Sequence, residues 1–465
     1  MSNRGLKRGW NAVVATSGLA LASIGLALTT SLPATAQLGL PGLPTLPINV
    51  PVRQTLTYPC NWIESIHHQR RNTGYPDTHA NYQVSAMPVL PPAGTVIKVS
   101  GVYPRTRYFT FSVYDGFRPG NLLDSIQDWQ LTPRLNGQPV LPPNLLPANL
   151  PNSGNHTYTW EITLKYTPPP ANDADREPDT LYMSDDTVRY LGFQITNVFG
   201  NKQLGLRTYL PDAGQNEFGG APLPVITYTA PDGTVVDSRN NPDQAQCDRL
   251  SNGQDLLLTV FPQARVSGPE NVEFRPDTSV DTFHTYPNGG TNYMRGPAAR
   301  IYSDMVIARF RMPVSPDADA QNALVRYTSI CQNQYNNTAV VACLADRELT
   351  VQPDGYAITV ISTNQRRPVK ASPAFGYNWM PWGPANEVLV YIRQILPNPG
   401  FVGNYDLAEA QPRQPLSTTI GVWAPELTYC DTQTFNANAD AGGAALIAAC
   451  RANYRPFRNG INTGN

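Results

Sequence analysis

The chain has few charged residues. Asp, Glu, Lys and Arg together make up 15% of its 465 residues, and the formal net charge is −1. A surface without a basic field has little attraction for phosphate backbones or acidic lipids, so we expect no nucleic-acid partner. Lys and Glu, which favour long helices, are scarce, whereas 45 prolines and 35 glycines interrupt the chain. This composition predicts short strands joined by turns.

Common catalytic and cofactor motifs are also missing. The sequence contains no G-x-S-x-G elbow, H-E-x-x-H motif, Walker loop or G-x-G-x-x-G fingerprint. At the level of motifs, this argues against the common hydrolase, metalloprotease and nucleotide-binding classes. No C-x2-C or H-x3-H spacing is present either, so we predict no metal site and no cofactor.

The N-terminus has the organisation of a secretory signal peptide. Three basic residues precede an apolar run from Ala12 to about Leu28, and an Ala-x-Ala ending closes at Ala36. We therefore predict a signal peptide at 1–36 and a mature chain that begins near Gln37. The run is just long enough to anchor the chain in a membrane, which is the alternative. No second run of that length follows, so we expect no transmembrane anchor in the mature chain and a secreted, periplasmic or cell-surface location.

Five short motifs occur twice in the same order, and this is the clearest pattern in the sequence. The first copies are Tyr75-Pro76 with Asn81-Tyr82, Val96–Val99, Arg107-Tyr108, Asp128–Thr132 and Arg207–Pro211; the second are Tyr286-Pro287 with Asn292-Tyr293, Val306–Arg309, Arg326-Tyr327, Asp346–Thr350 and Arg393–Pro397. Chance does not readily keep five matches in one order. We predict a tandem duplication of one domain.

The repeat divides the mature chain into four parts. A Pro-rich linker at 37–53 leads into domain 1 at 54–252, which is followed by domain 2 at 255–427 and a disulfide-stapled tail at 428–465. Residues 132–154 of domain 1 form an insertion with too many prolines for the interior of a sheet.

Strand-like segments with polar and apolar residues in alternation run through both domains. They are separated by turn residues such as Asp354-Gly355, and Ala441–Asn453 is the one predicted helix of the mature chain. The pattern predicts an all-β fold of two antiparallel β-sandwich or jelly-roll-like domains with a short helical tail. The predicted strands are 95–100, 107–114, 157–166, 190–197, 204–210, 225–230, 256–261, 305–310, 324–330, 357–362 and 388–395.

Six cysteines in an exported chain indicate disulfides rather than zinc ligands. Their order along the chain suggests that one bridge clasps the ends of domain 1, one closes a hairpin in domain 2 and one staples the tail. The predicted pairs are Cys60 with Cys247, Cys331 with Cys343, and Cys430 with Cys450.

The chain resembles a group of uncharacterised exported bacterial proteins related to DUF1214-type β domains. The resemblance rests on the N-x-Y segments with the strands that follow them, the Arg-Tyr motifs, the Cys331/Cys343 pair, residues 379–383 and the motif at 393–397. It covers most of the mature chain, through short motifs. It implies a β fold and supplies no catalytic residues.

Two pairs of charged residues recur in both copies and are candidates for structural contacts. We predict that Asp128 and Arg207 form one buried polar pair in domain 1, and that Asp346 and Arg393 form the other in domain 2. A carboxylate and a guanidinium can bind each other bidentately and fix the register of strands. The alternative is a catalytic role, which would have to be the same in both copies.

Two further groups can bind ligands. Tyr377, Trp379 and Trp382 can stack on a sugar ring or another flat ligand if they are exposed, or fill the end of a sandwich if they are buried. Several histidines cluster near His67 and His79, where the alternatives are a metal or base site and solvated loop residues.

We expect a non-catalytic protein that has a binding or structural role at the cell envelope, with an envelope component or a carbohydrate as its partner. The alternative is a secreted hydrolase that acts on carbohydrate or lipid in the cleft between the two copies. Such a cleft would hold two carboxylates about 5 to 10 Å apart.

Overall fold

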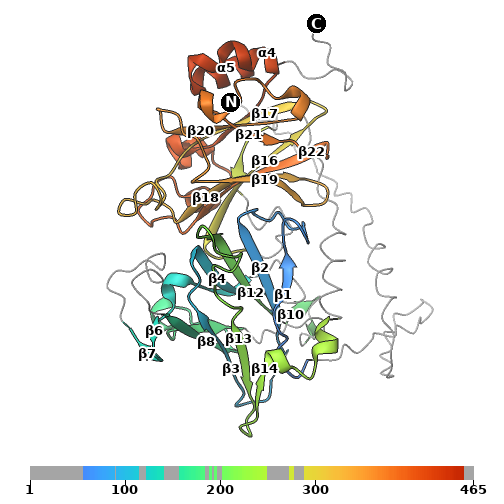
Figure 1. The fold of residues 1–465 in the computed structure, drawn as a ribbon, viewed down its shortest axis with the longest axis vertical. Coiled ribbons are helices and arrows are strands. Elements are labelled where there is room, and N and C mark those ends of the chain that lie inside the picture. Colours follow the sequence, from blue (N-terminus) through green and yellow to red (C-terminus); the bar gives the residue numbers. More distant parts are fainter. Residues whose placement is uncertain are drawn as a thin grey trace, which may run out of the picture. The chain divides into compact units, whose positions relative to one another are not determined.

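A computed structural model gives the structure of the chain (Figure 1). It describes residues 56–88, 91–114, 122–140, 157–183, 188–190, 193–195, 202–248, 272–276 and 287–454. All of these residues belong to one compact unit. The predicted signal peptide, the Pro-rich linker and the predicted strand at 256–261 lie outside the described residues.

Domain 1 contains two larger sheets. One has the strand order β1-β2-β12-β4-β5, and the other has the order β14-β13-β3-β8-β6-β7, with β9 parallel to β8. The strands are β1 (Ile63–Ile66), β2 (Ala80–Ala86), β3 (Val96–Val102), β4 (Thr106–Tyr114), β5 (Leu122–Gln127), β6 (Arg134–Leu135), β7 (Gln138–Pro139), β8 (Thr159–Lys165), β9 (Thr180–Tyr182), β12 (Gln203–Pro211), β13 (Val225–Thr229) and β14 (Val235–Asp237). Short 3-10 turns lie at η1 (Asp128–Gln130), η3 (Asp173–Asp175) and η4 (Ser238–Asn240).

Domain 2 also contains two sheets. Their orders are β15-β16-β22-β18-β19 and β21-β20-β17-β23, and β21 runs parallel to β20. The strands are β15 (Arg275–Pro276), β16 (Thr291–Ala299), β17 (Met305–Arg311), β18 (Tyr327–Gln334), β19 (Val340–Ala345), β20 (Tyr356–Ser362), β21 (Asn378–Pro381), β22 (Glu387–Ile395) and β23 (Glu426–Tyr429). The short helices are η6 (Asn364–Arg366), η7 (Pro373–Phe375), α2 (Tyr405–Glu409), α3 (Leu416–Thr419) and η8 (Gly421–Trp423).

The two domains repeat one topology. The order β1-β2-β12-β4-β5 matches β15-β16-β22-β18-β19 strand for strand, and the parallel pair occupies the same place in each second sheet. Repeated motifs also occupy equivalent ladder positions, because Tyr82 lies opposite Arg207 as Tyr293 lies opposite Arg393. The protein is therefore all-β, with two tandem sandwich domains of the same fold. The strand β23 extends past Leu427, where we predicted that domain 2 would end.

Both Arg-x-x-Leu-Pro motifs end in the same uncommon backbone conformation. Leu210 has φ 52° and Leu396 has φ 45°, which is the left-handed region that non-glycine residues rarely adopt. The N–H of Leu210 donates to the carbonyl of His79, and that of Leu396 donates to the carbonyl of Gly290. The motif thus closes an equivalent turn in each domain.

One of the five motif matches is displaced by a residue. Ile97 pairs with Leu164, which pairs with Leu181, and all three face the core of domain 1. In domain 2, the first residue of the equivalent row of paired, buried side chains is Val306. Val306 therefore corresponds to Ile97 and not to Val96. Because side chains alternate along a strand, a shift of one residue exchanges its buried and exposed faces. The predicted alignment of this motif was wrong by that one residue.

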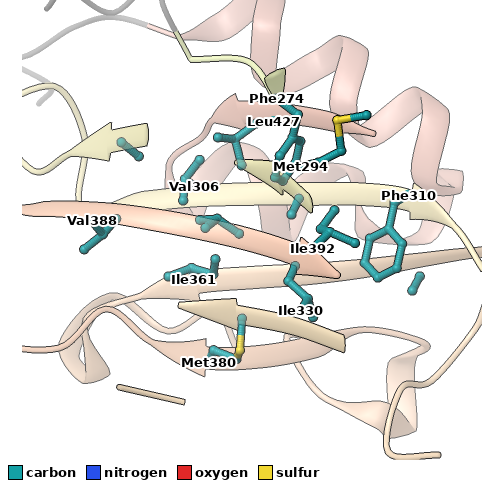
Figure 2. Close-up of a cluster of buried hydrophobic side chains, with 14 of the residues drawn as sticks. Phe274, Met294, Val306, Phe310, Ile330, Ile361, Met380, Val388, Ile392 and Leu427 are labelled. Carbon is teal, nitrogen blue, oxygen red and sulfur yellow. The ribbon is translucent and has the colours of Figure 1, made fainter. Parts of the chain in front are cut away.

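The core of each domain lies between its two sheets. In domain 2, Met294, Ile330 and Ile392 from the five-stranded sheet pack against Val306 and Ile361 from the four-stranded sheet. Figure 2 shows these side chains, with Phe310, Met380 and Leu427 beside them. The corresponding cluster of domain 1 has the same two-sheet origin.

The tail forms helices that cover one outer face of domain 2. Helices α4 (Thr432–Asn438) and α5 (Gly443–Asn453), joined by η9 (Ala439–Ala441), lie beside β17 and β20 (Figure 1). Phe435, Leu446 and Ile447 pack there against Ile307 and Val360. The predicted helix near 441–453 is confirmed, whereas α4 was not predicted.

Several strand predictions need correction. The segment 190–197 is not one strand, because β10 (Val188–Tyr190) and β11 (Phe193–Ile195) pair with each other as a separate two-stranded ladder. The strand predicted at 324–330 begins three residues later and continues to Gln334. The turn at Asp354-Gly355 is confirmed by the φ of 83° at Gly355 and by the bridge from Val351 to Ala357.

Candidate functional site at the junction of the two domains

The outer faces of the two five-stranded sheets contribute to one buried cluster. Tyr82, Tyr108 and Tyr209 of domain 1 share it with Tyr327 and Ile395 of domain 2. The rings of Tyr209 and Tyr327 lie 5.7 Å apart. Because one face of β4 and β12 packs on the core of domain 1 and the other on this cluster, both strands are buried along nearly their whole length.

Two reciprocal ion pairs join the domains within this buried junction. Arg107 of domain 1 donates to Asp346 of domain 2 at 2.9 and 3.0 Å, and Arg326 of domain 2 donates to Asp128 of domain 1 at 3.0 and 3.2 Å. Each arginine also donates to the backbone carbonyl of the other at 3.5 Å. Residue i of one domain contacts residue j of the other and the reverse also holds, which is the pattern of an isologous two-fold interface.

The two carboxylates of these pairs have equivalent backbone contacts and similar electrostatics. Asp128 accepts from the N–H of Phe109, and Asp346 accepts from the N–H of Thr328, both at 3.3 Å. Burial raises the pKa of Asp128 to about 6, against the opposing effect of Arg326. Burial also raises the pKa of Asp346, against the effect of Arg107. These ion pairs therefore link the two domains, although burial disfavours the ionised form of both carboxyl groups.

The predicted pairing within each domain was wrong. Asp128 binds Arg326 instead of Arg207, and Asp346 binds Arg107 instead of Arg393. The prediction identified the right carboxylates and treated them as structural, but it assumed that repeated residues contact each other within one copy. In an isologous junction the same residues can close their contacts across the two copies.

The arginines Arg207 and Arg393 lie elsewhere in the junction. Arg207 donates to the hydroxyl of Tyr114 at 3.1 Å and lies over the ring of Tyr82. Arg393 lies 3.7 Å from Asp77 and donates to the Sγ of Cys331 at 2.7 Å. Both guanidinium groups are buried. The contacts of Arg207 with Tyr114 and Tyr82 lie within domain 1, whereas Arg393 of domain 2 reaches Asp77 of domain 1 across the junction.

A charged cluster around Asp77 contains residues of both domains. Asp77 is fully buried and accepts hydrogen bonds from Ser329 Oγ at 2.6 Å and from the hydroxyl of Tyr327 at 2.9 Å. His79 Nδ1 lies 3.2 Å from Asp77, and its Nε2 lies 2.9 Å from Glu348 of domain 2. His79 thus bridges a carboxylate of each domain.

Hydrogen bonds and charges keep this cluster ionised. Burial opposes ionisation of Asp77, but the hydrogen bond from His79 and the charge of Arg393 outweigh it and hold the pKa of Asp77 well below its usual range. Burial likewise opposes the charge of His79, but its bonds to Asp77 and Glu348 raise the pKa of His79 to about 10. Near neutral pH, His79 is therefore a cation that links two anions.

The geometry differs from that of a hydrolase triad. In a triad the serine donates to the histidine, which acts as the base. Here Ser329 donates to Asp77, and both nitrogens of His79 are bonded to carboxylates. A histidine that stays protonated to about pH 10 cannot accept a proton at neutral pH, so the arrangement is suited to holding charge in place.

The cysteines near this cluster are joined to each other. Asp77, Cys331 and Cys343 place ligand atoms within 4.8 Å of one another. The two sulfurs form a disulfide, however, so they cannot supply the thiolates that a metal would need. The other two bridges are Cys60 with Cys247 and Cys430 with Cys450, and all three predicted pairs are confirmed.

The predicted aromatic ligand site is largely buried. Trp382 belongs to the core of domain 2, and Tyr377 packs under the tail helices. Trp379 is half-buried, donates to Ser362 Oγ at 3.0 Å and lies under the guanidinium of Arg367. Burial excludes the ligand-binding interpretation for Tyr377 and Trp382, which fill cores as the alternative predicted, whereas for Trp379 that interpretation stays a prediction. A tryptophan that does face solvent is Trp129 in η1, which is 56% exposed.

The histidines near His79 have mostly local contacts. His67 Nε2 lies 3.2 Å from Glu217, and the ring of His67 stacks on that of His68 at 4.6 Å. The sequence pattern pointed to His79 as one of several loop histidines but not to Asp77, Ser329 and Glu348. The signal that could have found them is asymmetry: Asp77 and Glu348 stand where the other copy has Asn288 and Gln130.

Comparison with known proteins gives little beyond this geometry. No protein-family model and no curated protein match the chain, so the resemblance to DUF1214-type proteins stays a prediction. An uncharacterised protein from Burkholderia cenocepacia of known crystal structure aligns at 12% identity over 83% of this chain and 85% of that chain, with a TM-score of 0.49. The BSP domain of a biofilm-associated protein aligns at 12% identity over 74% of this chain and 51% of that chain, with a TM-score of 0.16. Both similarities are too distant to bear on function.

Within the described residues, no helix has the length and apolarity needed to cross a membrane. The fold and junction define a two-domain β-sandwich protein whose halves are joined by reciprocal buried ion pairs.

Proposed function

We propose that this chain is an exported, non-catalytic β-sandwich protein with a binding or structural role at the cell envelope. The observation that carries the proposal is the reciprocal junction. The recurring aspartates, Asp128 and Asp346, bind the arginines of the Arg-Tyr motifs across it, so these residues serve to hold two domains in one arrangement. A fixed pair of domains is what a scaffold or a binding protein needs.

Three disulfides support the exported location. Such bridges form and persist in oxidising compartments, and all six cysteines are paired here. The signal peptide predicted at 1–36 agrees with this location. An envelope component or a carbohydrate remains the proposed partner.

The alternative, a hydrolase that works in the cleft between the copies, is less well supported. The faces that would form the walls of this cleft pack against each other in one buried cluster of tyrosine and aliphatic side chains. Of the carboxylates at the junction, Asp128, Asp346 and Asp77 are buried in contacts with arginine or hydroxyl groups. Glu348 and Asp317 are more exposed, with 43% and 48% of their side chains accessible.

Fractionation of cells tests the location. We expect the mature chain, beginning near Gln37, in the envelope or secreted fraction with no reactive thiol after unfolding without reductant. A cytoplasmic chain that starts at Met1 and carries reactive thiols would contradict the proposal.

An activity screen tests the class. We expect no turnover of glycosidic or ester substrates by the purified protein. Turnover that Glu348→Gln abolishes at an unchanged melting temperature, while the surface control Glu161→Gln retains it, would favour the hydrolase instead.

A further inference from the structure

The junction is symmetric in its ion pairs but asymmetric in the loops that flank them. In domain 1 the loop residues after the Tyr-Pro motif are Asp77, Thr78 and His79, and the equivalent residues of domain 2 are Asn288, Gly289 and Gly290. The backbone hydrogen bonds support the equivalence of the two loops. The carbonyl of His79 accepts from the N–H of Leu210, and the carbonyl of Gly290 accepts in the same way from the N–H of Leu396. Each loop packs on the opposite domain.

The loop of domain 2 fits a space that has no room for side chains. A Cβ atom on Gly289 would lie 2.2 Å from Ser125 Oγ, and one on Gly290 would lie 2.6 Å from the hydroxyl of Tyr108 and 2.7 Å from Gln127 Oε1. Gln127 occupies this space and accepts a hydrogen bond from Tyr108. Side chains at these two positions would force Ser125, Tyr108 and Gln127 to move, so this surface favours glycine there.

The loop of domain 1 fits a surface with the opposite character. Here the ladder position of Gln127 is taken by Ala345, since Gln127 pairs with Thr110 as Ala345 pairs with Ser329. The smaller side chain lies next to the charged contacts of His79 with Asp77 and Glu348. The two loops therefore solve the packing in opposite ways. A large loop residue, His79, faces the small Ala345, whereas a small loop residue, Gly290, faces the large Gln127.

We propose that the junction face of domain 1 is a protein-binding surface specific for domain 2 of this chain, and that it rejects another domain 1. Pairing two copies of domain 1 would bring Thr78 and His79 against Ser125, Tyr108 and Gln127, which leave no room for a Cβ atom unless their side chains move. Such overpacking is destabilising.

Pairing two copies of domain 2 would be unfavourable for a different reason. Asn288 would then take the place of Asp77, and Arg393 would lose the carboxylate that lies 3.7 Å away. Loss of one member of a buried charge pair is costly. Specificity for the mixed pair therefore combines a fitted contact with a penalty against each alternative.

The disulfides allow a direct test, because none of them joins the two domains. Cys60 and Cys247 lie before Gly253, and the other four cysteines lie after it. A protease recognition sequence inserted between Gly253 and Gln254 of the full chain lets the purified protein be cut into two pieces. We expect the cut pieces to elute together from a size-exclusion column as a one-to-one complex.

A second assay exports the same two pieces as separate chains with different tags. We expect each tag to recover both pieces, and the domain 1 piece to recover no second domain 1. Pieces that separate after the cut, pieces that are recovered singly or not at all, or a self-pairing domain 1 would overturn the proposal.

Substitutions at the glycine loop test the specificity. Gly290→His should lower recovery of the paired pieces by about tenfold or more. Gln127→Ala should restore much of that loss, because it recreates the histidine and alanine combination of the other side. Gly400→His is the matched control, since a Cβ atom there meets nothing closer than 3.7 Å. Wild-type recovery with Gly290→His, or equal loss in the control, would contradict the inference.

Discussion

Removal of the carboxylate of Asp128 should destabilise the protein more than removal of the carboxylate of Asp346. The two ion pairs look equivalent, but the two arginines keep different partners once the aspartate is removed. Arg326 has 5% of its side chain exposed, and among the described residues its carboxylate contacts come from Asp128. Arg107 also donates to Asp317, whose side chain is 48% exposed.

The expected magnitudes follow from this difference. Asp128→Ala leaves a buried guanidinium without a counter-charge, and it should lower the free energy of unfolding by about 3 to 5 kcal/mol. Asp346→Ala should cost roughly half as much, because Asp317 still compensates Arg107 from a partly solvated position. Urea unfolding followed by tryptophan fluorescence near neutral pH measures both values.

A third substitution completes the test. Asp317→Asn should have little effect alone and should bring the loss in the Asp346→Ala background close to that of Asp128→Ala. Equal losses for the two single alanine variants, or a larger loss for Asp346→Ala, would refute the reasoning from residual partners.

The remaining predictions concern pH and the disulfide next to the junction. Because burial raises the pKa of Asp128 to about 6, from about 3.9 when unfolded, folding favours the protonated carboxyl, and this pH-dependent part of the stability is present below pH ~4 and lost as the pH rises through about 6. It is separate from the counter-charge that the ionised carboxylate gives Arg326 near neutral pH. The stability of wild type relative to Asp128→Asn should fall over that window, and a flat difference would contradict this. The raised pKa of His79, about 10, gives a contribution to stability that is present below pH ~6.5 and lost as the pH rises through about 10. His79→Gln should therefore flatten the alkaline side of a plot of melting temperature against pH. An unchanged profile would exclude this role. Replacing Cys331 and Cys343 together by serine, the residues at the equivalent positions of domain 1, should leave a folded protein that is less stable by about 2 to 4 kcal/mol in chemical denaturation; failure to fold would show that the bridge is needed for more than this.

The sequence predicted the repeated topology well, because a repeat can be found by comparing two parts of a sequence without knowing which residues are in contact. Residues such as Tyr82 and Tyr293 occupy matching ladder positions whatever lies across the junction. The disulfides followed from the order of the cysteines along the chain.

Other features depend on information that a linear pattern does not carry. Strand β2 was not predicted although its residues alternate between apolar and polar, and it is buried on both faces, whereas alternation would have assigned it one exposed face. Whether Asp128 binds Arg207 or Arg326 depends on how the two copies pack, and a repeat is compatible with both. Burial of Trp382 likewise depends on the sheets that enclose it.

The central claim is that equivalent residues close their contacts across the junction, and a double-mutant cycle tests it most directly. Alanine substitutions at Asp128 and Arg326, alone and together, should show a coupling energy of roughly 1 to 3 kcal/mol. The same cycle with Asp128 and Arg207, the pair within domain 1, should show a clearly smaller coupling. Strong coupling of Asp128 to Arg207 together with none to Arg326 would contradict the account.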